Sequence, residues 1–379
     1  MSFDVKYDTA IIGGGLAGLT LAINLGKKGF KVILIEKETY PFHKVCGEYI
    51  SLESWQYLLS LGLPLDQMNL PIIKRLQVTA VNGKELQQDL PLGGFGISRY
   101  KIDNLLRDIA VQSGVTVIEN CKATDVSFKD DQFFITTSNG IINSRVCCGS
   151  FGKRSNLDIK WKREFTHRPP NKLNNFIAVK YHISTNHPND LISLHNFENG
   201  YCGISKIEDK KYCLCYLTNA ANLSLCNNSI EEMELKILGR NPHLKKLFSN
   251  ATKLYDSALS ISQISFEKKS SVQNHVLMVG DAAGLITPLC GNGMSMAMHA
   301  GKIAAENIKD FLENNISRTS LEKLYAEEWK KNFNSRLLTG RLVQRFFGKS
   351  WITNLFISIM KSFPSITKMI IRKTHGDVF

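Results

Sequence analysis

The segment that decides the fold, residues 7–36, reads YDTAIIGGGLAGLTLAINLGKKGFKVILIE. Residues 7–12 are apolar enough for a short buried parallel strand, and a glycine-rich turn follows them. We predict a helix over about residues 17–28, because Gly29 is a typical helix end. Residues 31–36 read as the next strand. Strand, turn, helix and strand in close succession form a βαβ unit.

The turn inside this unit has the glycine spacing of a dinucleotide-binding loop. Residues 13–18 read GGGLAG and fit Gly-x-Gly-x-x-Gly. Gly13 permits the tight turn, Gly15 lets the backbone approach a pyrophosphate, and Gly18 lets the helix pack closely on the sheet. The helix N-terminus offers N–H groups to the phosphates. An acid at the end of the next strand, Glu36, can accept a hydrogen bond from a ribose hydroxyl.

A second glycine motif lies far along the chain. Residues 279–284 read VGDAAG after a short apolar strand, and the carboxylate of Asp281 can hold a sugar-alcohol hydroxyl. Residues 288–293, PLCGNG, then open a helix whose N-terminus favours negative charge. Small residues there let a flat ring lie against the backbone. Because a reduced flavin carries negative charge on its ring, the two motifs together favour FAD over NAD.

The loop after the second strand contains the candidate catalytic side chains. Residues 42–48 read FHKVCGE. His43, Lys44 and Glu48 could transfer protons or anchor a substrate, and Cys46 could be a reactive thiol. The simpler interpretation is a small packed cysteine and solvated loop charges, since no second cysteine is placed to form a redox pair. The sequence does not single out one acid or base among the four.

The overall charge favours anionic ligands without indicating nucleic acid. Of 379 residues, 43% are hydrophobic and 21% charged, and the formal net charge is +13. A basic chain attracts anions such as acidic lipid headgroups or phosphorylated substrates, although a basic solvated surface explains the charge equally well. The chain has no zinc finger, zinc knuckle or arginine-rich block, so we expect no nucleic-acid partner.

Cysteine usage and hydropathy point to the cytoplasm. Nine cysteines, an odd number in a long chain, indicate reduced thiols packed as small apolar side chains. No group of His, Cys and acidic residues has metal-ligand spacing, so we expect no metal. No stretch approaches about 18 consecutive apolar residues, so we expect no membrane-spanning helix.

The periodicities predict an α/β fold with two interleaved domains and a C-terminal segment. The predicted Rossmann-type FAD-binding domain is discontinuous and comprises residues 1–71, 99–155 and 265–315. It includes an amphipathic helix opened by Arg99, whose side chain could hydrogen-bond a cofactor or phosphate. An inserted antiparallel β-sheet domain for the substrate comprises residues 72–98 and 156–264. C-terminal helices occupy residues 316–379.

The C-terminal segment is basic and amphipathic. Residues 321–379 contain 11 Lys and Arg against 4 Asp and Glu. Such a helix can lie on an anionic membrane surface. The commoner alternative is a helix that packs on the domain or covers the substrate cavity.

Together these motifs resemble the superfamily of geranylgeranyl reductases and para-hydroxybenzoate-hydroxylase-type flavin enzymes, over residues 7–305. The resemblance implies that Gly13, Gly15, Gly18 and Glu36 hold the ADP part of FAD and that Arg99 also contacts FAD. It implies that Gly280 and Asp281 hold the ribityl chain and that Pro288, Gly291 and Gly293 lie against the flavin ring. The predicted cofactor site also includes Leu16, Ala17, Lys37, Lys44, Cys46, Val126, Asn292 and Met294.

The motifs agree with the branches of this superfamily to different degrees. Residues 44–47, KVCG, are similar to the Lys-x-Cys-Gly stretch of the reductases. Residues 149–155 read GSFGKRS, with Phe151 where the hydroxylases carry an Asp that takes part in FAD and NADPH binding. Residues 201–206 read YCGISK, without the Trp of the reductases' Tyr-x-Trp-x-Phe-Pro motif. The Trp-x-Trp-x-Ile-Pro motif of flavin halogenases is absent from the sequence.

We therefore predict an FAD-dependent monooxygenase, with NAD(P)H as a transient reductant. Its substrate would be an apolar, phenolic or lipid-like small molecule of secondary metabolism. The alternative is a geranylgeranyl-reductase-like ene-reductase that saturates prenyl or polyene double bonds, and the most remote one is a flavin-binding protein without turnover. We expect a cytoplasmic protein, with peripheral contact to the inner face of the membrane through the C-terminal basic helix as an option. The sequence makes no prediction of the oligomeric state.

Overall fold

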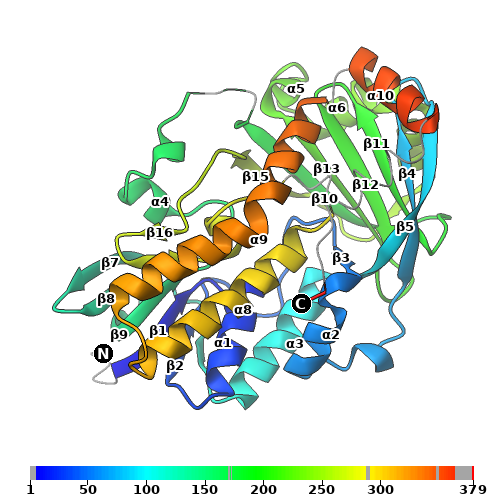
Figure 1. Cartoon of the computed structure of the whole chain (residues 1–379). Coiled ribbons are helices and arrows are strands. Elements are labelled where there is room, and N and C mark those ends of the chain that lie inside the picture. The colour runs from blue at the N-terminus through cyan, green and yellow to red at the C-terminus, as the bar shows by residue number, and fades with distance from the viewer. Residues whose placement is uncertain (1–5, 170, 172, 287–290, 347–349, 363–377) are drawn as a thin grey trace.

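Two β-sheets organise the protein (Figure 1). The computed structural model describes residues 6–169, 171, 173–286, 291–346, 350–362 and 378–379. The first sheet contains the N-terminal βαβ unit. Its eight strands are β1 (Lys6–Ile12), β2 (Val32–Ile35), β6 (Thr116–Ile118), β7 (Ala123–Lys129), β8 (Gln132–Thr137), β9 (Gly140–Gly149), β16 (Val272–Gln273) and β17 (Val276–Met278).

The carboxyl ends of four parallel strands in the first sheet coincide. Ile12 of β1 lies opposite Ile35 of β2 and Gly149 of β9, and Gly149 in turn lies opposite Met278 of β17. The turns that follow these strands therefore meet at one edge of the sheet. Ligands of open parallel sheets bind at this edge. The strand register thus brings the two glycine motifs together, although they are far apart in the sequence.

Helices α1 (Leu16–Gly26), α3 (Arg99–Gln112), α8 (Gly293–Leu312) and α9 (Arg318–Phe346) pack beside the first sheet (Figure 1). Helix α1 packs against both α3 and α8, and α9 packs on α8. Because α1 is buried along nearly its whole length, it is a core helix rather than an amphipathic surface helix. These helices and the first sheet share one hydrophobic core.

The second sheet is mainly antiparallel; β11 pairs with β4 in parallel. Its nine strands are β3 (Tyr49–Ser51), β4 (Ile72–Thr79), β5 (Glu85–Gly96), β10 (Phe176–Ser184), β11 (Leu191–Phe197), β12 (Gly200–Lys206), β13 (Tyr212–Asn219), β14 (Thr252–Lys253) and β15 (Leu259–Ile264). The remaining α-helices are α2 (Trp55–Leu61), α4 (Asn156–Lys160), α5 (Ala220–Ser224), α6 (Ile230–Lys236), α7 (Pro242–Asn250) and α10 (Ser350–Ser362).

The two faces of the second sheet have different roles. One face forms its own core with α6 and α7, through side chains such as Val179 of β10 and Leu244 of α7. The other face packs Ala178, Leu194 and Leu217 with Leu285, which follows the second glycine motif. The second sheet therefore presents an apolar surface towards the ligand-binding edge of the first.

The predicted fold class, a Rossmann-type α/β domain with an inserted antiparallel sheet and C-terminal helices, is confirmed. Three segments lie elsewhere than the predicted domain division places them. Strand β3 pairs with β5 in the second sheet rather than with the first. Helix α4 packs into the first core through Leu157, and Arg163 hydrogen-bonds the carbonyl of Ala282. Helix α9 also belongs to the first core, where the Tyr325 hydroxyl donates to the Met278 carbonyl over 2.6 Å.

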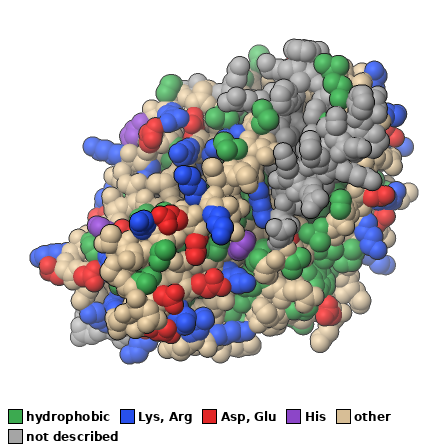
Figure 2. All heavy atoms as spheres, viewed as in Figure 1, with side chains coloured by type: hydrophobic (Ala, Val, Ile, Leu, Met, Phe, Trp, Pro, Cys, Tyr) green, Lys and Arg blue, Asp and Glu red, His purple; other side chains and the backbone are tan. Residues whose placement is uncertain are grey.

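Positive charge on the visible surface is dispersed. On the face shown in Figure 2, Lys and Arg side chains alternate with Asp and Glu rather than forming one basic patch. The basic residues on this face therefore form a mixed, solvated surface together with the acidic ones.

The C-terminal helices combine buried and exposed apolar side chains. None of the described helices is long and apolar enough to cross a membrane. Leu338 and Leu342 on α9, and Leu355 and Ile359 on α10, are exposed. Contact of this segment with a membrane surface stays a prediction, and residues 363–377 lie outside the described part.

Candidate functional site

The first glycine motif forms an open helix N-terminus at the edge of the first sheet. Gly13 has a φ of +108°, which accommodates the tight turn after β1. A Cβ on Gly18 would lie 2.1 Å from the Gly13 carbonyl oxygen, so only glycine allows α1 to start this close to the strand. Gly15 caps the helix without a side-chain hydrogen bond, and Gly15, Leu16 and Ala17 line a cavity. The positive end of the α1 dipole therefore faces a ligand space.

Two cations flank this helix N-terminus. A Cβ on Gly15 would lie 3.5 Å from Arg99 Nη2 and 3.9 Å from Lys44 Nζ, with no backbone nearby. Both cations bind one buried carboxylate, because Asp103 accepts from Arg99 over 2.7 Å and from Lys44 over 3.0 Å. Burial opposes ionisation of Asp103, but the charges of Arg99 and Lys44 lower the pKa of its carboxyl. The pair thus brings a net positive charge to a surface that suits a diphosphate.

Glu36 is fixed at the end of β2, beside the same turn. Its carboxylate accepts hydrogen bonds from the backbone N–H of Gly14 over 2.8 Å and of Glu38 over 3.1 Å. The side chain is buried, so these bonds hold it at the position predicted for ribose recognition.

The second glycine motif lines the same cavity next to the first, since a Cβ on Gly280 would lie 2.9 Å from the Ala17 Cβ. Gly280 has a φ of +66°, and Asp281 follows it in a short 3₁₀ turn that opens on the cavity. Burial raises the pKa of the Asp281 carboxyl, while the positive charges of Lys153, Lys269 and Arg99 oppose that rise. Among the described side chains, none donates a hydrogen bond to this carboxylate. Such a half-buried acceptor at a cavity wall fits the hydroxyl of a ligand.

The start of α8 also faces the cavity. Gly291, Gly293 and Met294 line it, and Asn292 is the fully buried N-cap residue of the helix. Pro288, predicted to lie against the flavin ring, falls outside the described residues.

The cavity extends from these two motifs into the second sheet. Its volume is about 220 Å³. The side chains from the second sheet and its neighbours are mainly apolar and include Ala178, Ile192, Leu194, Ile204, Leu217, Ile264 and Leu285. A few polar groups at the sides and a mainly apolar end are typical of a site for a small organic molecule.

The four candidate catalytic residues of the 42–48 loop have different surroundings. Cys46 lines the cavity, and its Sγ lies 3.5 Å from the Sδ of Met294. Lys44 belongs to the cation pair at the first motif. Glu48 adjoins the cavity, but its carboxylate points into the second sheet, where Lys180 Nζ lies 2.5 Å and His182 Nε2 lies 2.6 Å away.

The environment of Glu48 makes it an ion-pair partner rather than an available acid. Hydrogen bonds from His182 and Lys180, together with their charges, lower the pKa of its carboxyl against the effect of burial. Glu48 also accepts from the backbone N–H of Arg99 over 2.7 Å. The carboxylate therefore joins the loop, α3 and β10, and it stays ionised.

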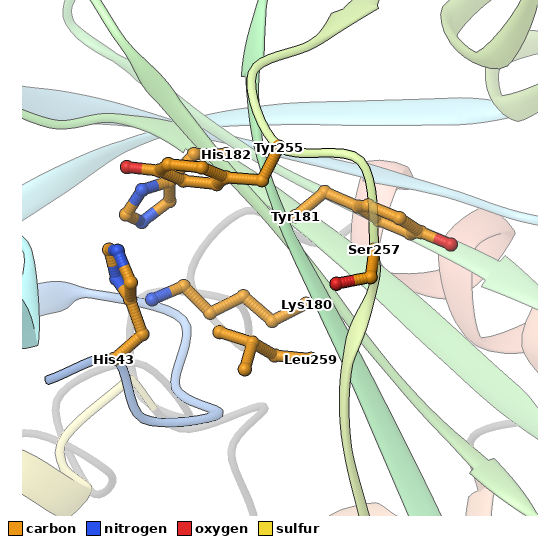
Figure 3. A pocket seen from close by; sticks show the side chains of 7 residues that line it. All are labelled: His43, Lys180, Tyr181, His182, Tyr255, Ser257 and Leu259. Atoms are coloured by element: carbon orange, nitrogen blue, oxygen red, sulfur yellow. The ribbon is translucent and has the colours of Figure 1, made fainter.

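His43 lies outside the main cavity. Figure 3 shows its ring in a separate small pocket with Lys180, His182 and Tyr255. Burial and the nearby charge of Lys180 lower the pKa of His43, so this imidazole is neutral at pH 7. A role at the flavin is therefore not favoured for His43.

One group in this region has the composition of a metal site. Ligand atoms of Glu48, His182 and Cys213 lie within 4.8 Å of one another. The Lys180 ammonium already neutralises Glu48, and burial raises the pKa of the Cys213 thiol well above its ordinary value. A buried ammonium and a protonated thiol disfavour a cation at this place.

Two predicted cofactor residues lie away from the cavity walls. Lys37 points outwards and pairs with the neighbouring Glu38. Val126 lies on β7 and packs against the first core.

Several residues that hold the site together were not predicted from the sequence. Asp103 follows Arg99 by one helical turn, and that spacing on a predicted helix could have revealed the pair. Lys180 and His182 alternate on a buried strand, but their partner Glu48 is far away in the sequence, so no local signal links them. Lys153 lies in the 149–155 segment, and no role was predicted for it from the sequence.

The residues at both motifs fit FAD. The open α1 N-terminus and the Arg99–Lys44 pair suit a diphosphate, and the Asp281 carboxylate at the cavity wall can accept from a sugar hydroxyl. Glu36 is buried beside the turn after β1, where its carboxylate accepts from the Gly14 N–H.

Comparison with known proteins agrees with this geometry. Residues 8–43 match the family described as FAD binding domain. The flavin-dependent brominase Bmp2 superposes with a TM-score of 0.81 at 22% identity, over 99% of this chain and 94% of that one. A geranylgeranyl bacteriochlorophyll reductase-like protein from Thermoplasma acidophilum superposes with a TM-score of 0.78 at 18% identity, over 97% and 95%. The fold is that of the FAD-dependent oxidoreductases.

Two curated relatives carry names of the same two kinds, a brominase and a reductase. A 1H-pyrrole-2-carbonyl-(peptidyl-carrier protein) brominase of Pseudoalteromonas luteoviolacea is 24% identical over 100% of this chain and 94% of its own length. The digeranylgeranylglycerophospholipid reductase of Methanosarcina acetivorans is 24% identical over 90% and 84%. The resemblance to the geranylgeranyl-reductase superfamily drawn from the motifs is therefore confirmed. The halogenase likeness was not expected, because the chain lacks the halogenase tryptophan motif.

Proposed function

We propose that the protein is an FAD-dependent monooxygenase that hydroxylates a mainly apolar, phenolic or lipid-like substrate. The observation that carries the proposal is the single cavity that joins both glycine motifs to the apolar face of the second sheet. In such a reaction the substrate C–H becomes C–OH, the second oxygen atom of O₂ leaves as water, and NAD(P)H supplies the two electrons.

Different residues along the cavity would bind different parts of FAD. The α1 N-terminus, with Arg99 and Lys44, would hold the diphosphate of FAD, and Glu36 would hold the adenosine ribose. Asp281 would accept from a hydroxyl of the ribityl chain. When bound, FAD supplies the redox chemistry, which includes acceptance of a hydride and reaction with O₂. The walls of the second sheet exclude water and orient the substrate beside the ring.

Reduction of a carbon–carbon double bond is the second candidate, and Cys46 is the observation that favours it. Its thiol is at the cavity wall next to the start of α8, where it could donate the proton that follows hydride transfer to an alkene. Relatives named as digeranylgeranylglycerophospholipid reductases support the same candidate. Halogenation, the reaction in the name of another relative, is a third outcome to be tested.

One experiment separates these reactions. The purified protein is loaded with FAD and reduced with NADPH or NADH without O₂, and flavin absorbance is followed. Reoxidation by O₂ with incorporation of ¹⁸O into an alkylphenol supports the monooxygenase. Anaerobic reoxidation by a polyprenyl compound supports the reductase, and bromide-dependent bromination of the same phenol supports the halogenase. Failure to retain FAD would exclude all three.

A further inference from the structure

The cations around the cavity differ in whether a described carboxylate pairs with them. Arg99 and Lys44 share the carboxylate of Asp103, and Lys180, whose side chain is visible in Figure 3, is paired with Glu48. Each of these cations therefore has an anionic partner within the protein.

The Lys269 ammonium is hydrogen-bonded to backbone carbonyls instead of a carboxylate. It is buried, and its ammonium donates to the backbone carbonyls of Lys153 over 2.9 Å and of Asp281 over 3.0 Å. Burial lowers the pKa of Lys269 to about 8. This side chain ties together the turns after β9 and β17, and its donors point at those two carbonyls.

Lys153 differs from these cations. It extends from the turn after β9, lines the cavity, and makes one long hydrogen bond of 3.3 Å to the Val45 carbonyl. Within the part of the chain that the structure describes, its ammonium forms no ion pair. Lys153 is half-buried, and an ammonium at a cavity wall gains free energy from an anionic ligand that binds beside it.

The position of Lys153 separates it from the diphosphate site. Its charge acts on the Asp281 carboxyl of the second motif and on the Cys215 thiol of the second sheet. Arg99 and Lys44 instead stand in front of Gly15, at the other motif. Lys153 therefore lies where the cofactor part of the cavity meets its apolar end.

We propose that the Lys153 ammonium binds an anionic oxygen of the otherwise apolar substrate, a carboxylate or a phenolate. This inference rests on the proposed function and narrows its substrate class to an apolar molecule with one anionic group. In the hydroxylation of a phenol the same contact would favour the phenolate, the electron-rich form that attacks an electrophilic oxygen.

Equilibrium dialysis of the FAD-loaded protein tests the proposal without turnover. The probes are two matched pairs: decanoate with methyl decanoate, and 4-nitrophenol with 4-nitroanisole, in buffer above the pKa of the phenol. The variants are Lys153→Met and Lys153→Arg. Arg154→Met serves as the matched control, because Arg154 is the exposed neighbour and does not line the cavity.

We expect the wild type to bind at least one anion more tightly than its neutral partner. Lys153→Met should weaken that anion about tenfold or more and leave the neutral partner unchanged. Lys153→Arg should retain most of the preference, and Arg154→Met all of it. The pair that shows the preference identifies carboxylate or phenolate.

Two results would overturn the proposal while leaving the FAD assignment intact. One is a wild-type protein that retains FAD but binds neither anion more tightly than its neutral partner. The other is a Lys153→Met protein that loses affinity for FAD and keeps the anion preference, since the ammonium would then serve the cofactor. A wild type that does not bind FAD would refute the proposed function instead.

Discussion

A single carboxylate should contribute measurably to the affinity for FAD, and Asp281 is the clearest candidate. Its carboxylate is half-buried at the cavity wall without a described donor, so a bound hydroxyl would be its partner. Asp281→Asn keeps the shape and removes the charge. Because a hydrogen bond to a charged group contributes about 1.5–3 kcal/mol, we expect FAD to bind roughly tenfold to a hundredfold more weakly.

The measurement for Asp281 is the dissociation constant of FAD from flavin fluorescence. Asp310→Asn, at an exposed site on α8, is the control and should change nothing. Equal affinity of wild type and Asp281→Asn would show that this carboxylate does not contact FAD.

Glu48 illustrates a residue whose role depends on its partners rather than on its chemistry alone. Glu48→Gln leaves the Lys180 ammonium buried without a counter-charge, which costs about 3–5 kcal/mol of the free energy of unfolding. The double variant Glu48→Gln/Lys180→Met should lose less than the sum of the single losses. Urea unfolding measures all of these values.

An exposed ion pair provides the comparison for Glu48. Arg75 and Asp190 form an ion pair with 41% and 45% side-chain exposure, so Asp190→Asn should cost less than about 1 kcal/mol. If Glu48→Gln cost no more than Asp190→Asn, the buried pair would not hold the loop in place.

Helices and strands with local sequence signals were predicted correctly, whereas pairings between residues far apart in the sequence were not. Helix α8 (Gly293–Leu312) opens at the glycine turn of residues 288–293 as predicted, because this turn is a local signal. The short strand β3 was missed, since its pairing with β5 depends on residues forty positions later. For the same reason Glu48 could be named as a candidate, but its partners Lys180 and His182 could not.

Helix α9 contributes more to the first core than its sequence indicated. The C-terminal segment was expected to lie on a membrane surface, to pack on the domain or to cover the substrate cavity, and Phe333 and Leu337 of α9 belong to the first core. Phe333→Ala should therefore lower the free energy of unfolding by about 3–5 kcal/mol. The measurement is urea unfolding, and Leu338→Ala, at a position that is 55% exposed on the same helix, should change it by less than about 0.5 kcal/mol. Equal effects of the two substitutions would mean that α9 is not part of that core.

At the scale of the whole molecule, the site exists because two sheets face each other. The first sheet brings the turns after β1, β2, β9 and β17 to one edge, and the second closes that edge with an apolar face. Cofactor residues come from short motifs that a sequence displays. The substrate end comes from strands scattered between residues 176 and 264, so its shape follows only from tertiary packing.

The acid stability of the whole protein should depend on a buried histidine in the second sheet. Burial, with a smaller contribution from His243, lowers the pKa of His195 to about 3. The unfolded chain protonates this residue below about pH 6.5. The neutral imidazole thus contributes stability that is complete above that pH and is lost as the pH falls towards 3. Between pH 7 and pH 5 the loss should be about 2 kcal/mol.

Urea unfolding at several pH values measures this loss. His195→Gln should make the decline between pH 7 and pH 5 smaller by about 2 kcal/mol, whatever its effect on stability at pH 7, because the side chain no longer titrates. The contribution of His299, whose pKa burial lowers to about 4, remains in this variant. His167→Gln, at an exposed position, should keep the decline of the wild type. The carboxylates of Glu48 and Asp103, whose pKa values are lowered, lose their contribution only at lower pH, as their own protonation begins. An unchanged decline in His195→Gln would therefore assign the loss above pH 5 to other groups and refute the role of His195.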